Sequence, residues 1–526
     1  MFKLAVLVAA TALIGGCDAT SSGPPTTPGT SEVSPPLEPA TALPDNAVED
    51  AVGKLDGIAD ELMKKSGIPG MAVAVVHGGK TIYAKGFGVK DVRKGGAPEN
   101  AVDADTVFQL ASVSKSLSST VVANQVGQGR IAWDTPVAEK LPWFALADPV
   151  VTKMVTVGDM FAHRSGLPDH AGDLLEDLGY DRRYVLEHLR ELPLDQFRTS
   201  YAYTNFGLTA GAEAVAVNAG KAWEDLSQEV LYGPLGMTST SSNFSDYESR
   251  PDRAVGHIHL DDAYQPLFVR DAQPESPAGG ASSSVNDMSK WLAMMLADGN
   301  FQGQQIVDPK ALLPALTPQS VSNPPAEPAA RPGFYGYGFN VGTTSDARVQ
   351  FSHSGAFDLG AGTNFVIIPS ADVAIVALTN ATPSGVPEAL TAQFADLVQF
   401  GEPREDWYKL YGDAFGAMEQ PVGSLVGQTP PATPAPAPPP TALVGTYDND
   451  YWGPARVAEA GGKLTLALGP RDVFDLTHWD GNVFTFTPTG ENAFPGTISK
   501  ATFDGDKLTL EFYDEEKLGT FSRAGR

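Results

Sequence analysis

The chain has 526 residues, with 36 Lys and Arg against 63 Asp and Glu, and its net charge of -27 argues against binding to nucleic acid or to an anionic membrane surface. A single cysteine excludes an internal disulfide framework and a thiolate metal cage. With 42% hydrophobic residues, a chain of this length predicts a globular protein of two or more domains.

The first residues are typical of an export signal. Lys3 precedes an apolar run over residues 4–14, which is too short to span a bilayer stably. Two glycines before Cys17 complete a pattern that resembles the lipobox of bacterial lipoproteins, in which cleavage before the cysteine leaves its thiol to be lipidated. We expect residues 1–16 to be a lipoprotein signal peptide, and the mature protein to sit in the periplasm or cell envelope on a lipid anchor at Cys17. An ordinary secretory signal with a coincidental cysteine is the alternative.

Composition divides the remaining chain into four parts. Residues 17–45 are rich in Pro, Ser, Thr and Gly, so they cannot offset their ordering entropy by burial and are expected to be a disordered tether. Residues 46–423 form a large domain. Residues 424–441 contain a Pro/Ala run of polyproline type, which predicts a semi-rigid spacer. Residues 442–526 form a small second domain.

The large domain combines β-rich ends with a helical middle. An amphipathic helix is predicted over residues 47–66 and a closing helix over residues 402–418. Apolar, β-rich runs predict strands at residues 71–76, 81–87, 349–351, 362–368 and 372–378. The economical topology is an α/β (α+β) fold, in which an antiparallel sheet from both ends of the domain is flanked by helices and carries a helical insertion.

The small domain has the pattern of an antiparallel meander. Short alternating runs are separated by Gly-Gly and Asp-Gly turns, and they predict strands at residues 463–468, 483–486, 497–503 and 507–512. About eight such strands would close a small β-barrel and remove its exposed edges. We expect the barrel interior to be filled by side chains. The barrel could also pack beside an active-site cleft, where it would restrict access to small substrates, or mediate oligomers.

Ser112 and Lys115 are the chemically most informative pair. They open a predicted helix after a strand-like segment, and residues three apart share a helix face, so an amine lies one turn from a hydroxyl that has to lose its proton. The hydroxyl also lies near a helix N-terminus, which favours developing negative charge. This is the spacing of a serine acyl-transfer enzyme. The alternative is a serine-rich helix start, because Ser is a common N-cap.

Three later segments follow this pair in order, at residues 155–168, 201–205 and 353–355. The ordered set resembles the serine β-lactamase and penicillin-binding superfamily, in its class C, esterase and D-aminopeptidase-like branch. Residues 234–237 and 276–280 also match recurring segments of that branch. The resemblance implies the fold class given above, and the C-terminal domain resembles the lipocalin-like module attached to some of these hydrolases.

The resemblance also implies a role for each site residue. Ser112 is the expected nucleophile, and Lys115 and Tyr203 are expected to share the general-base work. An ammonium beside a phenol should lower the pKa of the phenol, while proximity drives the amine to lose its own proton, so the pair is expected to titrate as a unit. Tyr203 as an ordinary half-buried aromatic is the alternative.

Substrate binding is expected from four further residues. Asn205 should hydrogen-bond Lys115 and a substrate amide. The resemblance implies an oxyanion hole from the backbone N–H groups of Ser112 and Ala356. We attribute Gly355 to a close approach of the backbone to ligand, and we expect His353 either to touch substrate or to line the sheet edge. His163 and its neighbours are expected to stabilise a loop.

The chain departs from the family pattern at one motif, and this departure affects which substrates we expect it to accept. β-Lactamases of the family usually carry Lys-Thr-Gly where this chain has residues 353–355, and a neutral imidazole holds a carboxylate less strongly than that lysine. The sequence therefore predicts hydrolysis of esters or small-peptide amides, including D-amino-acid peptides. D,D-carboxypeptidase or β-lactamase activity, or a sensor or binding protein without turnover, are the alternatives. The sequence does not indicate an oligomeric state.

A metal site is the rival hypothesis. His257, His259 and Asp261 follow the start of the His-x-His-x-Asp pattern of binuclear zinc hydrolases, but Asp262 stands where that pattern requires a histidine. We interpret this segment as an exposed polar loop. Neither a metal nor another cofactor is expected.

Overall fold

The computed structural model describes residues 42–344, 346–418 and 420–525. The predicted signal peptide, Cys17 and nearly all of the predicted tether lie outside these residues. No helix in the described ranges is long and apolar enough to cross a bilayer.

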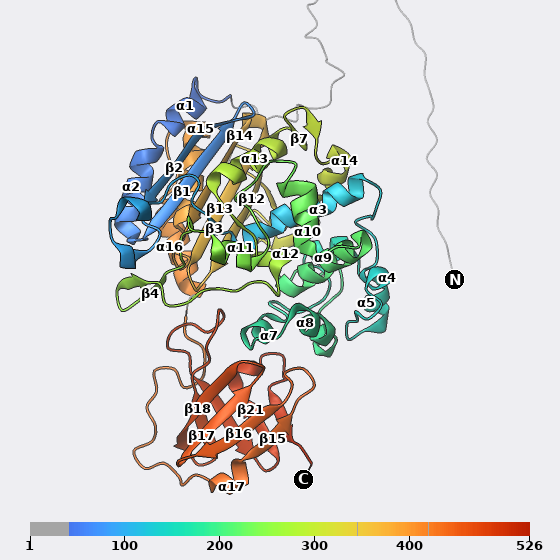
Figure 1. The fold of residues 1–526 in the computed structure, drawn as a ribbon, viewed down its shortest axis with the longest axis vertical. Helices are drawn as coiled ribbons and strands as arrows, with labels where there is room; N and C mark the ends of the chain where they lie inside the picture. The colour runs from blue at the N-terminus through green and yellow to red at the C-terminus, as the bar shows by residue number, and fades with distance from the viewer. Residues whose placement is uncertain (1–41, 345, 419, 526) are drawn as a thin grey trace, which may run out of the picture. The chain divides into compact units, whose positions relative to one another are not determined.

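An eight-stranded antiparallel sheet forms the centre of the large domain (Figure 1). Its strand order is β2-β1-β14-β13-β12-β11-β10-β9. The strands are β1 (Gly70–His77), β2 (Lys80–Gly88), β9 (Ser320–Asn323), β10 (Gly333–Tyr335), β11 (Asn340–Thr343), β12 (Val349–Phe357), β13 (Ala361–Ile368) and β14 (Val373–Thr379). The predicted α/β (α+β) fold class is therefore confirmed, with strands from both ends of the domain paired through β1 and β14.

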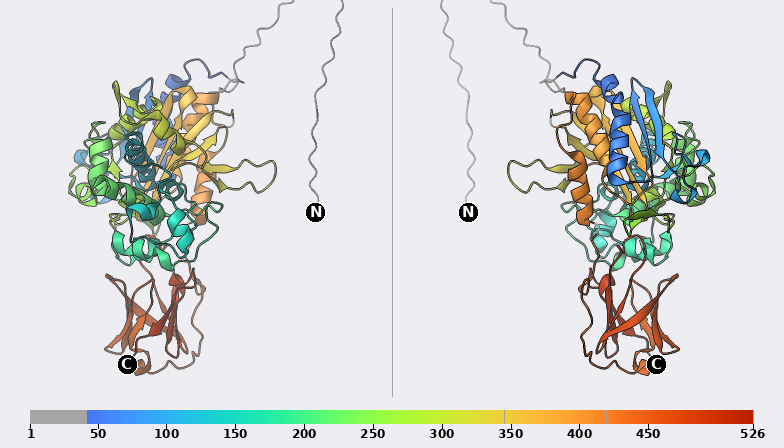
Figure 2. Two further views of the ribbon diagram at one scale, coloured as in Figure 1. Left: turned by 90° about the vertical axis from the view of Figure 1, so that its right-hand side faces the viewer. Right: turned by 90° about the vertical axis from the view of Figure 1, so that its left-hand side faces the viewer.

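Helices cover both faces of the sheet, as the two side views of Figure 2 show. On β1, Met71, Val73 and Val75 pack on one face, and Ala72, Ala74 and Val76 pack on the other. This alternation buries both faces of a central strand. The first face is covered by α1 (Ala47–Val52), α2 (Leu55–Ser66) and α15 (Val386–Phe400), and the second by α3 (Ser114–Gly127) and α13 (Val285–Leu296).

Two local predictions are corrected by the structure. The single helix predicted over residues 47–66 is two helices, because the chain bends at Gly53 and Lys54 between α1 and α2. The sheet also has three strands that the apolar pattern does not reveal, since β9, β10 and β11 are only three or four residues long, and β9 and β11 are mostly polar or exposed. The predicted closing helix is α16 (Trp407–Met418), which packs on α15.

The C-terminal strands close into an eight-stranded barrel, as predicted. They are β15 (Gly445–Asp448), β16 (Ala455–Ala460), β17 (Lys463–Leu468), β18 (Asp472–Asp480), β19 (Val483–Phe486), β20 (Ser499–Asp504), β21 (Lys507–Leu510) and β22 (Thr520–Arg523). Alternate residues on these strands, including Leu466, Phe474, Phe484, Phe503 and Phe521, are buried in the core. The Pro/Ala spacer is tied to this domain, because the backbone N–H of Ala435 donates to Asp480 and its carbonyl accepts from Gly481.

Candidate active site

Ser112 lies on a strained turn at the start of α3. It belongs to the 3₁₀ helix η3 (Ala111–Val113), and Ala111 before it has a φ of 46°, a left-handed conformation that a residue with a Cβ rarely adopts. Lys115 follows one turn later, and its Nζ donates to Ser112 Oγ at 3.0 Å. The turn and the helix thus present the hydroxyl and the amine to each other, as the sequence spacing predicts.

Lys115 is completely buried and is held by three acceptors. Besides Ser112 Oγ, its Nζ donates to Asn205 Oδ1 at 2.6 Å and to the carbonyl of Ala278 at 3.1 Å. Burial lowers the pKa of Lys115 to about 8, while the charges of Glu275 and Asp173 oppose this shift. The neutral amine is therefore accessible near neutral pH, as a general base requires.

Tyr203 contacts the same serine. Its side chain hydrogen-bonds Ser112, and Lys115 Nζ lies 4.6 Å from the centroid of its ring. Enclosure of this half-buried phenol raises its pKa well above the ordinary value. The expected lowering of the tyrosine pKa is thus wrong, because desolvation outweighs the hydrogen bond with Ser112, and the charges of Glu275 and Asp173 add to the rise. Tyr203 is protonated at rest, which suits it to donate a proton or to relay one.

His163 braces the segment that carries Tyr203, in agreement with the predicted loop-stabilising role. Its Nδ1 accepts from the backbone N–H of Thr204 at 3.1 Å, its carbonyl accepts from Ala202 at 3.0 Å, and its ring lies 4.5 Å from that of Tyr203. Since both neighbours of Tyr203 in the chain are bonded to His163, the phenol is fixed in position.

Asn205 begins α9 (Asn205–Ala219) and links Lys115 to a second polar layer. Its Nδ2 donates to Asp173 Oδ2 at 2.9 Å, and the same carboxylate pairs with His170 Nδ1 at 2.9 Å. Asp173 fixes the orientation of the Asn205 amide, so that Oδ1 faces Lys115. The Asp173 hydrogen bond raises the pKa of His170 to about 9.

The strand β12 runs beside the serine. A Cβ at Gly355 would stand 2.3 Å from the carbonyl oxygen of Leu110 and 3.0 Å from the backbone nitrogen of Ser112. Gly355 is therefore needed for a close approach to the backbone of Leu110 and Ser112, and its expected approach to a ligand stays a prediction. Ala356, the next residue, is exposed to the cleft.

His353 has both ring nitrogens engaged by the protein. Nδ1 donates to the carbonyl of Ser354 at 2.5 Å, so Nε2 is the acceptor for the hydroxyl of Tyr335 at 2.7 Å. Burial and the charge of Lys115 lower the pKa of His353 to about 3, which keeps the imidazole neutral. His353 therefore provides no positive charge to the cleft.

These residues line a cleft of about 1220 Å³. The large domain contributes Ser112, Tyr203, Asn205, His353 and Ala356, and the barrel domain contributes Trp452, Glu491, Asn492, Phe494 and Tyr513, among others. The barrel therefore packs beside the site and forms part of its wall, which was one of the expected arrangements.

The rival metal pattern does not form a site. His257 is buried, its Nδ1 bonds the carbonyl of Asn380 at 3.0 Å, and its Nε2 accepts from Val92 N–H at 3.2 Å. His259 packs against Tyr264 instead. The residues described contain no cluster of three or more His, Cys, Asp or Glu side chains that could hold a metal ion.

Several functional candidates were missed by sequence reasoning. Asp173, Tyr335 and the carbonyl of Ala278 contact the predicted residues directly. Ala278 lies in residues 276–280, whose family match could have indicated it, and His170 lies in a His-x-Gly pattern that recurs by chance. Asp173 and Tyr335 carry no spacing signal, because they reach the site through tertiary structure alone.

Comparison with known proteins gives two family matches. A family model described as Beta-lactamase matches residues 55–400, and a model described as a domain of unknown function (DUF3471) matches residues 429–518. The first match covers the whole catalytic sheet and all the residues proposed for catalysis, and the second covers most of the barrel.

Individual relatives agree with the first match. The chain is 30% identical to the unguisins hydrolase ungD' of Aspergillus campestris (strain IBT 28561), over 77% of this chain and 78% of that protein. It is 28% identical to penicillin-binding protein 4 of Amycolatopsis lactamdurans, over 75% of this chain and 97% of that protein. Among solved structures, the octameric penicillin-binding protein homologue from Pyrococcus abyssi aligns with a TM-score of 0.56 at 19% identity, over 88% of this chain and 98% of that one.

Proposed function

From the premise that the chain belongs to the beta-lactamase family and is a serine hydrolase, we propose that it forms an acyl-enzyme on Ser112 and cleaves esters or small-peptide amides, including those of D-amino acids. The observation that carries this proposal is the meeting of Ser112 Oγ with Lys115 Nζ, at 3.0 Å, and with the side chain of Tyr203 in one cleft. A nucleophile, a base and a proton donor are the groups that acyl transfer requires.

The proposed reaction has two halves. Neutral Lys115 removes the proton of Ser112 as its Oγ bonds to the carbonyl carbon, and the N–H groups of Ser112 and Ala356 stabilise the oxyanion. The proton passes through Tyr203 to the leaving alcohol or amine as its bond to carbon breaks. Water then attacks the acyl-enzyme and gives a proton to Lys115. As the bond between the acyl carbon and Ser112 Oγ breaks, Lys115 returns this proton to Oγ, so that the acid, free Ser112 and neutral Lys115 result.

Labelling tests the proposal directly. The protein should hydrolyse p-nitrophenyl butyrate, and a fluorophosphonate should modify Ser112, as located by peptide mass spectrometry. Penicillin G, followed over time, should give a transient adduct or none. A permanent penicillin adduct without ester turnover would indicate a sensor, and the absence of both labelling and turnover would indicate an inert scaffold; either result would contradict the proposed hydrolase.

The neutral His353 predicts how the enzyme treats a carboxylate on its substrate. A charge-assisted hydrogen bond at this position would favour the anion by about 10- to 100-fold, but both His353 nitrogens are engaged and its pKa is about 3. We expect kcat/KM for nitrocefin to be no higher than that for its methyl ester, which has the same ring without the charge. A preference of about tenfold or more for nitrocefin would contradict this assignment.

We also propose that the protein is an exported lipoprotein anchored through Cys17, supported by the lipobox-like sequence before it. In a Gram-negative host, the protein should incorporate labelled palmitate, and Cys17→Ala should not. Asp18→Ala leaves the thiol in place and should be labelled like the unaltered chain. Equal labelling of the Cys17→Ala variant would refute the anchor.

A further inference from the structure

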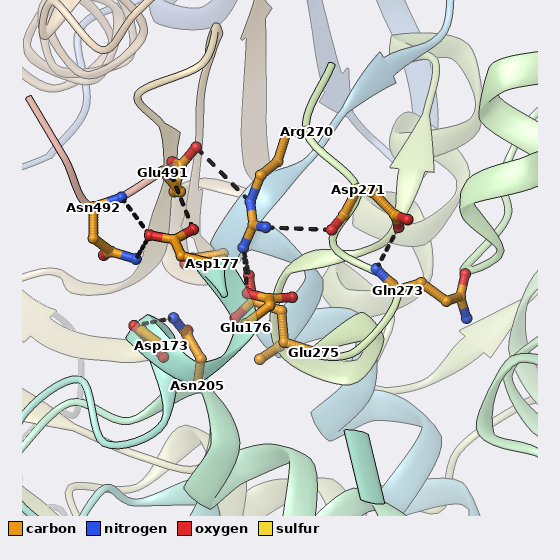
Figure 3. A network of polar contacts seen from close by, with 12 residues as sticks. Asp173, Glu176, Asp177, Asn205, Arg270, Asp271, Gln273, Glu275, Glu491 and Asn492 are labelled. Atoms are coloured by element: carbon orange, nitrogen blue, oxygen red, sulfur yellow. Dashed lines mark hydrogen bonds and ion pairs between the residues drawn. The ribbon is translucent and has the colours of Figure 1, made fainter. Parts of the chain in front are cut away.

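A short barrel segment enters the large domain beside the cleft (Figure 3). Asp177, at the end of α7 (Asp173–Asp177), accepts from the backbone N–H groups of Glu491 and Asn492, each at 3.0 Å, and from Asn492 Nδ2 at 2.9 Å. Gly490 permits this approach, because it has a φ of 124° and a Cβ there would stand 2.5 Å from Asp177 Cγ. The segment is thus clamped by three hydrogen bonds to one carboxylate.

The clamp directs the Glu491 side chain onto the turn after β12. Glu491 Oε1 accepts from the backbone N–H of Asp358 at 2.6 Å, and Oε2 from that of Leu359 at 3.4 Å. Asp358 is two residues beyond Ala356, whose N–H is the proposed oxyanion donor. A carboxylate from the second domain therefore holds the end of the strand that carries this donor.

Arg270 connects the Glu491 carboxylate to Glu176 and Glu275 (Figure 3). Its Nε lies 3.8 Å from Glu491 Oε2, and its Nη2 donates to Glu275 Oε1 at 2.9 Å and to Glu176 Oε2 at 2.5 Å. Glu275 directly precedes α12 (Ser276–Gly279), in which the carbonyl of Ala278 accepts from Lys115. One buried guanidinium thus bridges the barrel carboxylate, α7 and the segment that holds the base.

We propose that Glu491 is a positioning residue for the hydrolase, holding the turn after β12 so that the Ala356 N–H stays directed at the oxyanion. This inference rests on the proposed acyl-enzyme reaction and assigns the barrel a part in it. Glu491 does not touch the reacting atoms; it acts through Asp358 and Leu359.

The effect of Glu491 on the turn after β12 can be separated from the docking of the barrel, because other hydrogen bonds also hold the barrel to the large domain. The Tyr180 hydroxyl donates to the carbonyl of Trp452 at 2.9 Å, and the three hydrogen bonds to Asp177 do not involve the Glu491 side chain. A Glu491 variant therefore keeps the barrel docked while it releases the turn. Asn492→Ala removes one of the hydrogen bonds that dock the barrel. It leaves the Glu491 carboxylate in place, so the turn stays held.

The test measures kcat and KM for p-nitrophenyl butyrate, per active site titrated with fluorophosphonate. We expect Glu491→Ala to lower kcat by about 10- to 100-fold, somewhat less than the about 100- to 1,000-fold cost of deleting an oxyanion donor, with KM changed less than about threefold. Glu491→Gln should recover most of kcat, since its amide oxygen can accept from Asp358 N–H. Asp475→Asn, an exposed carboxylate on β18, should leave both constants unchanged.

Three outcomes would overturn the inference. An unchanged kcat in Glu491→Ala would do so, as would equal losses in the Ala and Gln variants. A loss in Asn492→Ala as large as in Glu491→Ala would reduce Glu491 to a docking contact. If the unaltered protein shows neither turnover nor labelling, the proposed function fails instead, which is a distinguishable result.

Discussion

Replacing Ser112 by alanine should lower kcat for p-nitrophenyl butyrate by about 1,000-fold or more and abolish fluorophosphonate labelling, because loss of a nucleophilic serine can cost about a million-fold in turnover. Its Oγ is the group that Lys115 Nζ and Tyr203 both contact. Residual hydrolysis should show no acyl-enzyme by mass spectrometry.

A matched control lies seven residues further along the chain, in α3. Ser119 is buried in α3, and its hydroxyl makes no hydrogen bond within the part of the chain that the structure describes. Ser119→Ala should therefore retain the activity and thermal stability of the unaltered protein. Full esterase activity in Ser112→Ala would show that the nucleophile has been assigned to the wrong residue.

Replacing Lys115 by methionine should lower kcat by about 100- to 10,000-fold, the usual contribution of a general base. The variant should still fold, because methionine fills the same space and removes a buried cation whose pKa burial lowers to about 8. Circular dichroism should show unchanged secondary structure, so that a loss of rate is a loss of chemistry. A kcat within about tenfold of the unaltered value would contradict the base assignment.

The pH dependence provides a second measurement of the same base. Lys115 acts in its neutral form, so kcat/KM of the unaltered enzyme should fall as pH drops through about 8 and level off above it. Below that point, each pH unit should reduce the rate about tenfold, because the neutral fraction falls in proportion. His353 is already neutral, since its pKa is about 3, and should add no second step near neutrality. A rate independent of pH between 6 and 9 would exclude a titrating base in this range.

The sequence predicts which groups react better than it predicts the surroundings that tune them. The pairing of Ser112 with Lys115 follows from helical periodicity, and the order of the later motifs brings Tyr203 and Asn205 to the same point. The direction of the tyrosine pKa could not be predicted, because it depends on how completely the fold encloses the phenol. Residue types and spacing carry no measure of that desolvation.

The fold was likewise predictable only in part: local turns follow from the sequence, and contacts between distant segments do not. The glycine pair between β1 and β2 predicts a hairpin, and both glycines adopt the left-handed conformation that such a turn requires. The strands β9 to β11 could not be predicted, because runs of three or four residues are too short to show an alternation of apolar and polar residues. The barrel was predictable as a barrel, but its contact with Asp177 and Arg270 pairs residues more than 200 positions apart.

The pairing of β15 with β22 has a consequence for the order in which the two domains can form. These two strands begin and end the barrel, so the barrel closes only when residues 445–448 meet residues 520–523. The sheet of the large domain pairs β1 with β14 and includes no strand of the barrel. The nucleophile can therefore be positioned by the large domain first, and the cleft gains its second wall only when the barrel closes.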